Sequence, residues 1–176
     1  MKKLYLLRHG QTEFNVKKLV QGRCDSPLTD LGRQQARAAA AWLKAHSVVP
    51  DKVVSSPLGR AMDTASLVAC ELLGPDAAVE PCEGIIERCY GTFEEGPHDA
   101  LPTDVWDPGE DLVPFGGEGS QALQERMLGT LTNLMGSEGI ETLLAVSHGS
   151  ASRQFIKAAA PCLLYTSPSP RDISGS

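Results

Sequence analysis

The feature that most constrains the fold is a pair of short apolar runs, each followed closely by a histidine and a glycine. Leu4-Tyr5-Leu6-Leu7 leads into Arg8-His9-Gly10, and residues 143–146 lead into Ser147-His148-Gly149. Unbroken apolar runs of this length are typical of strands buried on both faces, as in parallel sheets covered by helices. Because ligands bind outside the carboxyl ends of such strands, both runs are expected to deliver a histidine to a ligand-binding edge.

The rest of the chain alternates between strand and helix patterns. Strands are expected over residues 3–7, 51–55, 78–81 and 141–147. Helices are expected over residues 29–46, 56–73, 118–135 and 149–160. This alternation predicts an α/β fold with three layers and a mostly parallel central sheet. Residues 94–119 are rich in glycine, proline and acidic side chains without a clean period, which is typical of a lid or binding loop.

Local signals set the expected ends of the helices. Thr29 is expected to be the N-cap of the first long helix. Ser56 is expected to cap the second, with Pro57 in its first turn and Gly74 after its end. The apolar stripe of the first helix is assigned to Leu31, Ala38, Trp42 and Leu43. The stripe of the third is assigned to Leu123, Met127, Leu131 and Leu134.

Composition narrows the classes of function. With 176 residues, the chain is expected to form one domain. A net charge of −6 and the absence of a lysine–arginine block argue against nucleic acid or an anionic membrane as partners. The apolar stretches are too short to span a membrane, and Arg8 interrupts the first of them too early for a signal peptide, so a cytoplasmic protein is expected. The cysteines are odd in number and include no C-x-x-C pair, which favours reduced thiols over disulfides or a zinc site.

The last residues differ from the rest of the chain. From Cys162 to Asp172 the sequence resembles, codon by codon, the direct translation of a transposon-end sequencing adapter. We therefore expect residues 162–176 to be a non-native tail. The native domain would comprise residues 1–161 and be incomplete at its C-terminus, and we expect this chain to be less stable and less soluble than a full-length parent.

Charged residues follow three of the expected strands. Arg8 and His9 end the first, Arg60 lies just after the second, and His148 follows the last. If these strands are parallel neighbours, two arginines and two histidines converge on one pocket. The helices that begin there also direct free backbone N–H groups toward it. Such a pocket favours an anion with several oxygens, and phosphate fits best.

These residues lie in motifs that resemble those of the histidine phosphatase superfamily, in its phosphoglycerate mutase-like branch. The resemblance covers essentially all of residues 2–160 and keeps the order of the family's motifs. They are Leu7-Arg8-His9-Gly10-Gln11-Thr12-Glu13-Phe14-Asn15, Gly22-Arg23-Cys24-Asp25-Ser26-Pro27-Leu28-Thr29-Asp30-Leu31-Gly32, Ser55-Ser56-Pro57-Leu58-Gly59-Arg60-Ala61, Glu87-Arg88-Cys89-Tyr90-Gly91-Thr92-Phe93-Glu94-Glu95-Gly96, Gly116-Gly117-Glu118 with Arg126, and Val146-Ser147-His148-Gly149.

The resemblance implies roles for individual residues. His9 would be the nucleophile that becomes phosphohistidine, and Glu87 would protonate the leaving oxygen and then activate water. The expected substrate-binding residues are Arg8, Asn15, Gln21, Gly22, Arg60 and His148. Cationic neighbours would keep His9 neutral, whereas His148 is a candidate charged donor to the transition state. Two guanidinium groups would replace the metal ions of other phosphatases, so neither a metal nor a cofactor is expected.

Phosphatases and mutases of this family share the same catalytic residues. The compact spacing between Glu87 and His148 resembles that of the phosphatases, so the expected activity is a metal-independent phosphomonoesterase acting on a small phosphorylated metabolite. A cofactor-dependent phosphoglycerate mutase and a non-catalytic phospho-ligand-binding relative remain alternatives. His98 is expected to be solvated. Seven lid acids, if they overhang the site, would repel heavily phosphorylated substrates: Glu94, Glu95, Asp99, Asp104, Asp107, Glu110 and Asp111.

Overall fold

The computed structural model describes residues 1–160. Its centre is a sheet of four strands, which are β1 (Lys3–Arg8), β2 (Lys52–Ser55), β3 (Glu80–Pro81) and β4 (Thr142–Ser147). The strands lie in the order β1-β4-β2-β3, and every neighbouring pair is parallel, as the sequence predicts. The proposed domain boundary at Pro161 and the adapter-like tail lie outside the described residues.

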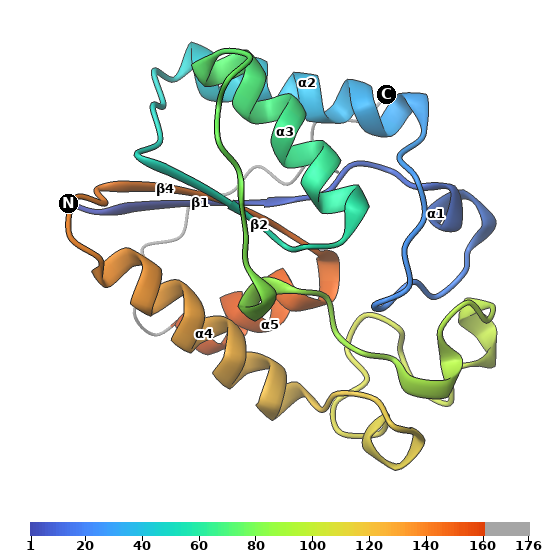
Figure 1. Cartoon of the computed structure of the whole chain (residues 1–176). Coiled ribbons are helices and arrows are strands. Elements are labelled where there is room, and N and C mark those ends of the chain that lie inside the picture. Colours follow the sequence, from blue (N-terminus) through green and yellow to red (C-terminus); the bar gives the residue numbers. More distant parts are fainter. Residues whose placement is uncertain (161–176) are drawn as a thin grey trace.

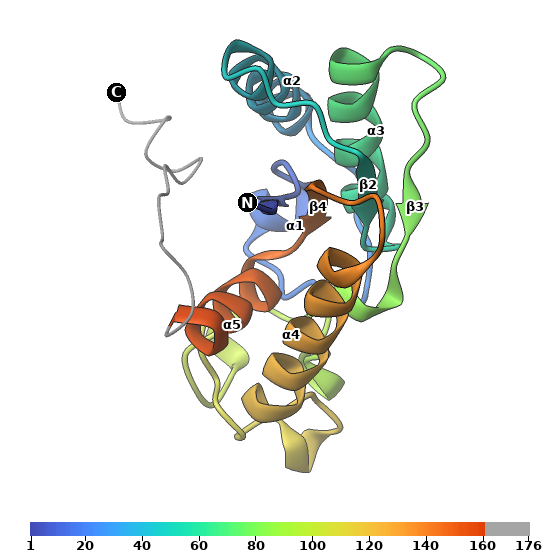
Figure 2. The same ribbon diagram turned by 90° about the vertical axis from the view of Figure 1, so that its left-hand side faces the viewer.

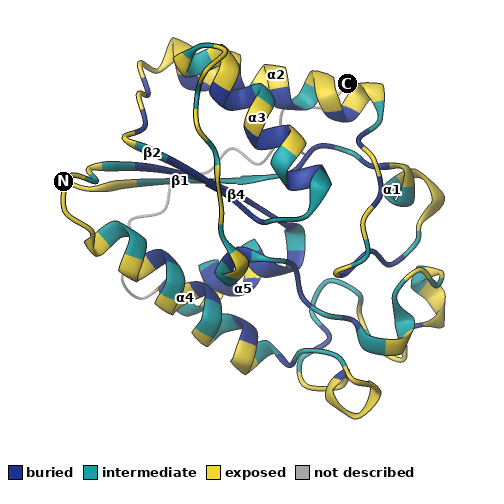
Figure 3. Ribbon diagram, in the orientation of Figure 1, coloured by how far each residue is buried: buried dark blue, intermediate teal, exposed yellow. Residues whose placement is uncertain are grey.

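Helices cover both faces of the sheet and complete the three layers. Figures 1 and 2 show α2 (Asp30–Ala45) and α3 (Gly59–Leu73) on one face, and α4 (Ser120–Gly136) and α5 (Gly149–Ala159) on the other. Figure 3 shows that the helix sides facing the sheet are the buried ones. Adjacent residues of β4 serve opposite faces: Leu143 packs in the core with α4 and α5, and Leu144 in the core with α2 and α3. Within residues 1–160, no helix combines the length and apolar character needed to cross a bilayer.

The helix α2 begins as predicted but turns a different side to the core. Thr29 caps it, because its hydroxyl accepts the Gly32 N–H at 3.0 Å. Of the predicted stripe, however, only Leu43 is buried, and three residues are exposed: Leu31, Ala38 and Trp42. The buried side instead presents Ala36 and Ala40 to residues of α3. Small side chains allow two helices to lie close together, so the bulky residues of α2 face outward.

The start of α3 also differs from the prediction. The helix begins at Gly59, and Ser56 makes no N-cap interaction. One of its first N–H groups, that of Arg60, instead donates to the Asp25 carboxylate in a distant loop at 3.4 Å. The predicted end is confirmed, because α3 ends at Leu73 and Gly74 follows it with a φ of 102°.

The predicted lid, residues 94–119, lies in a segment of turns rather than in a regular element. Between β3 and α4 lie four short 3₁₀ turns, at Glu83–Ile85, Gly91–Phe93, His98–Ala100 and Val113–Phe115. The segment packs through a small apolar cluster of its own, in which Val20 joins Tyr90, Leu101 and Leu112. The stripe predicted for α4 is confirmed, because Leu123, Met127, Leu131 and Leu134 all join the core beside the sheet.

Candidate active site

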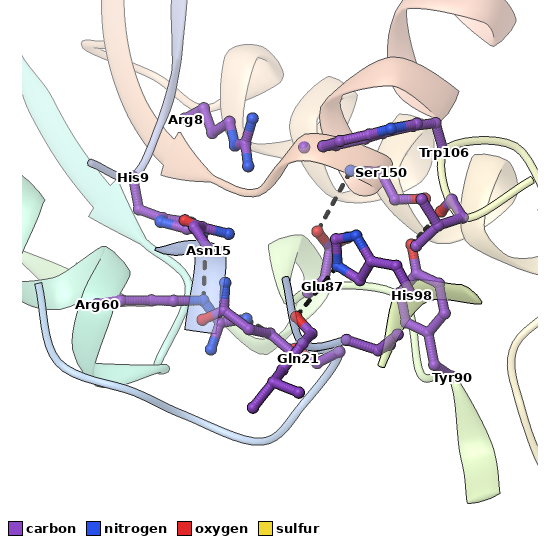
Figure 4. Close-up of a pocket in the computed structure, with 15 residues that line it drawn as sticks. Arg8, His9, Asn15, Gln21, Arg60, Glu87, Tyr90, His98, Trp106 and Ser150 are labelled. Atoms are coloured by element: carbon purple, nitrogen blue, oxygen red, sulfur yellow. Dashed lines mark hydrogen bonds between the residues drawn. The ribbon is translucent and has the colours of Figure 1, made fainter. Parts of the chain in front are cut away.

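The candidate site lies at the carboxyl edge of the sheet. In the register of the sheet Arg8 pairs with Ser147, so β1 and β4 end side by side. The His9 N–H then donates to the Ser147 carbonyl at 3.0 Å, and the Ser56 N–H donates to the Val146 carbonyl at 2.9 Å. A pocket opens at this edge (Figure 4), and most of the predicted site residues line it: Arg8, His9, Asn15, Gln21, Gly22, Arg60 and Glu87. The structure thus brings these seven residues together at one pocket.

His9 is held in one orientation and one protonation form. Its Nδ1 lies 2.7 Å from the Gly10 carbonyl oxygen, which can only accept, so Nδ1 carries the proton. Its Nε2 lies 3.3 Å from Nε of Arg60 and accepts that N–H. Burial lowers the pKa of His9 well below 6.5, and the charges of Arg60 and Arg8 lower it further. The imidazole is therefore neutral, with a lone pair on Nε2.

Arg60 is fixed by oxygens of the loop that follows α1 (Glu13–Lys17). Its side chain is almost fully buried in the first turn of α3. The guanidinium donates to the Gly22 and Cys24 carbonyls, both at 2.7 Å, and to the Asp25 carboxylate at 3.0 Å. The loop thus sets the plane of the guanidinium beside His9.

Glu94 in turn holds this loop in place. Its carboxylate accepts the backbone N–H groups of Arg23 at 3.0 Å, Cys24 at 3.2 Å and Tyr90 at 2.9 Å. Gly22 has a φ of 55°, and a Cβ there would lie 2.2 Å from Glu94 Oε1. Burial and the Glu94 carboxylate raise the pKa of the Cys24 thiol to about 12. Glu94 is thus a residue of the site's framework, a role that sequence reasoning missed.

Glu87 is positioned by the start of α5. Its carboxylate accepts the N–H groups of Ser150 at 3.2 Å and Ala151 at 2.9 Å, and also the Arg88 N–H at 2.8 Å. The first turn of a helix offers free N–H groups of this kind. The side chain is buried and lies toward the centre of the pocket in Figure 4.

His148 is the one predicted site residue that does not line the pocket. It is fully buried beside His9, with ring centroids 5.1 Å apart. Its Nε2 lies 2.6 Å from the Ser56 hydroxyl. Burial lowers the pKa of His148 well below 6.5, and the charges of Arg60 and Arg8 act in the same direction. The lowered pKa favours the uncharged imidazole in this arrangement, whereas the expectation of a charged donor concerns the transition state and stays a prediction.

Residues of the lid, of the loop after α1 and of the segment after Glu87 form another wall of the pocket. This wall is largely apolar and aromatic: Leu19, Val20, Tyr90, His98, Val105 and Trp106. The Arg8 guanidinium lies over the Trp106 ring, 5.6 Å from its centroid. His98 is only half-exposed, and its Nε2 lies 3.1 Å from the Leu19 carbonyl, so the expectation that it is solvated is wrong. No regular pattern in the lid indicated these residues.

The seven lid acids do not line the pocket, so the condition for their repelling phosphorylated substrates is not met. Glu87 is the only acidic residue that lines it within residues 1–160. Asp107 pairs with Lys157 and accepts from Gln154, and Glu110 accepts the Gln121 N–H. Like Glu94, these acidic residues accept hydrogen bonds from other parts of the folded chain. Within the same residues, no group of three or more histidine, cysteine, aspartate or glutamate side chains could hold a metal ion.

The fold and the pocket define a three-layer α/β protein whose parallel sheet ends in a cationic site suited to a phosphorylated ligand. The family model of the histidine phosphatase superfamily (branch 1) matches residues 4–168. The chain belongs to this family.

Individual relatives include both phosphatases and mutases. A broad-specificity phosphatase of Saccharomyces cerevisiae is 32% identical over 158 residues, which cover 88% of this chain and 69% of the yeast protein. The probable phosphoglycerate mutase GpmB of Cronobacter sakazakii is 34% identical, covering 86% of this chain and 71% of that protein. The structure of a phosphoserine phosphatase from Entamoeba histolytica in complex with phosphoserine superposes with a TM-score of 0.76 at 32% identity, covering 92% of this chain and 81% of that one.

Proposed function

We propose that this protein is a metal-independent phosphomonoesterase that hydrolyses small phosphate monoesters through a phosphohistidine at His9. The observation that carries the proposal is the state of the His9 imidazole. Its Nδ1 proton is engaged by Gly10, and its Nε2 lone pair lies beside Arg60 in the pocket. A neutral imidazole presented in this way is the form that attacks phosphorus.

In the first step, the lone pair of His9 Nε2 forms a bond to phosphorus while the bond from phosphorus to the ester oxygen breaks. Glu87 gives a proton to the departing oxygen, so that an alcohol leaves. The transferring group spreads negative charge over three oxygens. Arg8 and Arg60 supply the positive charge that other phosphoryl-transfer sites obtain from metal ions.

In the second step, water attacks the phosphorus of phosphohistidine. The Glu87 carboxylate accepts a proton from that water, and the bond between phosphorus and Nε2 breaks as its electron pair returns to His9. Inorganic phosphate leaves, and the enzyme regains its starting protonation. Backbone N–H groups of α5 hold the Glu87 carboxyl group in the pocket, so the same group is in place for both steps.

The charges of the pocket favour a phosphatase over a mutase. Arg8 and Arg60 are the only lysine or arginine residues lining it within the described chain. Arg88, which follows Glu87, is fully buried and donates instead to four groups of the fold: Ser150, Gly109, Glu118 and Ser120. A phosphoglycerate would bring a carboxylate for which the pocket has no further cation. The proposed substrate is therefore a monoester with an uncharged leaving group, which meets the apolar wall.

The test is turnover of p-nitrophenyl phosphate in the presence of EDTA. We expect activity, and a loss of roughly a thousandfold or more in His9→Ala. His46→Ala, at an exposed position outside the pocket, is the matched control and should behave as the wild type. No turnover, or turnover that survives His9→Ala, would contradict the proposal.

Two further measurements separate the alternatives. With 3-phosphoglycerate, a mutase would yield 2-phosphoglycerate without net phosphate release. A non-catalytic relative would bind phosphate but form no phosphoenzyme. Rapid quenching in alkali with a ³²P-labelled monoester should trap acid-labile phosphohistidine in the wild type and none in His9→Ala.

A further inference from the structure

Ser56 is a buried polar residue with a partner in the candidate site. It follows β2 at the carboxyl edge of the sheet and is completely buried. Its hydroxyl oxygen lies 2.6 Å from Nε2 of His148 and 3.4 Å from the Leu58 backbone N–H. The hydroxyl is thus available to the imidazole and is not used as a helix cap.

The hydrogen-bond inventory of this group decides which atom carries the proton. The Leu58 N–H can only donate, so the Ser56 oxygen accepts from it. The hydroxyl has one proton to give, and His148 Nε2 is the only acceptor that the structure records for it within residues 1–160. If Nε2 were itself protonated, the hydroxyl proton would be buried without an acceptor, which costs free energy. With Ser56 donating to Nε2, only the Nδ1–H of His148 is left without a partner within residues 1–160, whereas the other tautomer leaves both the hydroxyl proton and the Nδ1 lone pair unpaired.

This arrangement leaves the imidazole proton on Nδ1. His148 Nδ1 is buried and has no hydrogen-bond partner within residues 1–160. Its ring packs edge to face against that of His9. A neutral His148 therefore presents an unsatisfied N–H donor beside the nucleophile. A phosphoryl group transferred to His9 would supply an oxygen that accepts this N–H.

We propose that Ser56 is a positioning residue that fixes the tautomer of His148, so that Nδ1–H is the donor to the phosphoryl group. The proposal rests on the phosphatase function proposed above. Ser56 itself touches neither substrate nor nucleophile; it acts through His148. The role of the imidazole is then that of a neutral hydrogen-bond donor that is oriented before substrate arrives.

The preceding residue provides a matched control. Ser55 is equally buried, and its hydroxyl donates to the Ser56 carbonyl at 2.9 Å. Ser55→Ala therefore removes a hydroxyl oxygen from the adjacent residue and leaves the hydrogen bond between Ser56 and His148 in place. Ser56→Thr keeps a hydroxyl at the site, whereas Ser56→Ala removes it.

The direct test is ¹⁵N NMR of histidine-labelled protein at pH 7.5. The chain has four histidines, so His148 can be assigned by comparison with His148→Asn. Protonated and unprotonated imidazole nitrogens have well-separated shifts, and we expect the wild type to show Nδ1 protonated and Nε2 unprotonated. Ser56→Ala should give a mixture of tautomers, and Ser55→Ala should give the wild-type spectrum. A wild-type His148 protonated on Nε2 overturns the proposal.

Kinetics supply the second readout. We expect Ser56→Ala to lower kcat for p-nitrophenyl phosphate roughly 10-fold, the loss expected for about 1.4 kcal/mol of transition-state stabilisation. Ser56→Thr should recover most of it, and Ser55→Ala should stay within about twofold. Equal losses in Ser55→Ala and Ser56→Ala would show a merely structural effect and overturn the proposal. If the wild type shows no turnover, the proposed function fails, but the tautomer measurement still decides the role of Ser56.

Discussion

The two histidines of the site should make the stability of the protein depend on pH between about 7.5 and 5. Both His9 and His148 are buried, and each has a pKa held well below 6.5, chiefly by burial. In the unfolded chain the same imidazoles titrate near 6.5. Below that pH the unfolded state therefore binds protons that the folded state does not, and the free energy of unfolding falls as pH is lowered.

The size of the effect follows from the linkage relation. Each histidine that stays neutral in the folded protein lowers stability by about 1.4 kcal/mol per pH unit below 6.5. At pH 5.0 the ceiling is about 2 kcal/mol for one histidine and about 4 kcal/mol for both. The pKa values of Asp51 and Asp107 are lowered instead by hydrogen bonds. Those carboxylates contribute stability that is lost only at lower pH, as pH falls from about 4 through their folded values.

The assay is urea unfolding at pH 7.5 and pH 5.0, followed by circular dichroism. We expect the wild type to lose several kcal/mol, and His9→Asn and His148→Asn each to lose up to about 2 kcal/mol less than the wild type over the same interval. His46→Asn is the control, because His46 is exposed. A wild-type free energy of unfolding that is equal at the two pH values would refute the reasoning. So would a pH dependence that His46→Asn flattens as much as His148→Asn does.

Other consequences concern the framework and the wall of the pocket. Glu95 has a φ of 65°, so Glu95→Gly should raise the free energy of unfolding by about 1 kcal/mol; a decrease in urea unfolding would contradict this. Glu94→Gln should lower the free energy of unfolding by about 2 kcal/mol, because an amide group cannot accept from every N–H donor around Glu94. Glu138→Gln, the same charge change at an exposed position, should leave the free energy of unfolding unchanged; equal effects of the two substitutions would contradict the role of Glu94 in holding the loop after α1. Trp106→Ala should raise KM for phenyl phosphate roughly 3- to 10-fold more than KM for methyl phosphate, which changes only through the contact of Trp106 with Arg8; equal shifts in steady-state assays would contradict an aromatic wall.

The sheet and the residues at its edge could be predicted because the signal for each is local. The apolar run before Arg8 predicts a strand without reference to any other segment, and the end of that strand places His9 at the edge of the sheet. The same holds for the run before His148. Parallel order then brings these ends together without further information, since parallel strands end at the same edge. The position of His148 behind His9, rather than in the pocket wall, could not be predicted, because it depends on how the imidazole packs against Ser56.

The predictions of helix boundaries and buried faces were wrong where contacts with a distant segment determine them. Ser56 is of a residue type that commonly caps helices, but its hydroxyl contacts the imidazole of His148, which follows β4. Asp25 accepts a backbone N–H at the start of α3 instead. The face of α2 was misassigned because large apolar side chains were weighted above alanines. In the structure, Ala36 and Ala40 set the distance to α3, and Trp42 stacks on His46 at the surface. Neither outcome follows from the periodicity of one helix.

The lid shows why charge counted along a sequence does not determine the potential inside a pocket. Glu94 and Glu110 could be counted as repulsive charges, but each accepts hydrogen bonds from backbone N–H groups of the surrounding fold. An acid engaged in this way is held against donors of the fold and does not line the pocket, although the charge of Glu94 still acts on Arg60. Discrimination between substrates then depends on what the wall offers the leaving group. That wall presents Trp106 and Tyr90 rather than a further cation, so we expect an uncharged, apolar leaving group to be preferred over a carboxylate-bearing one.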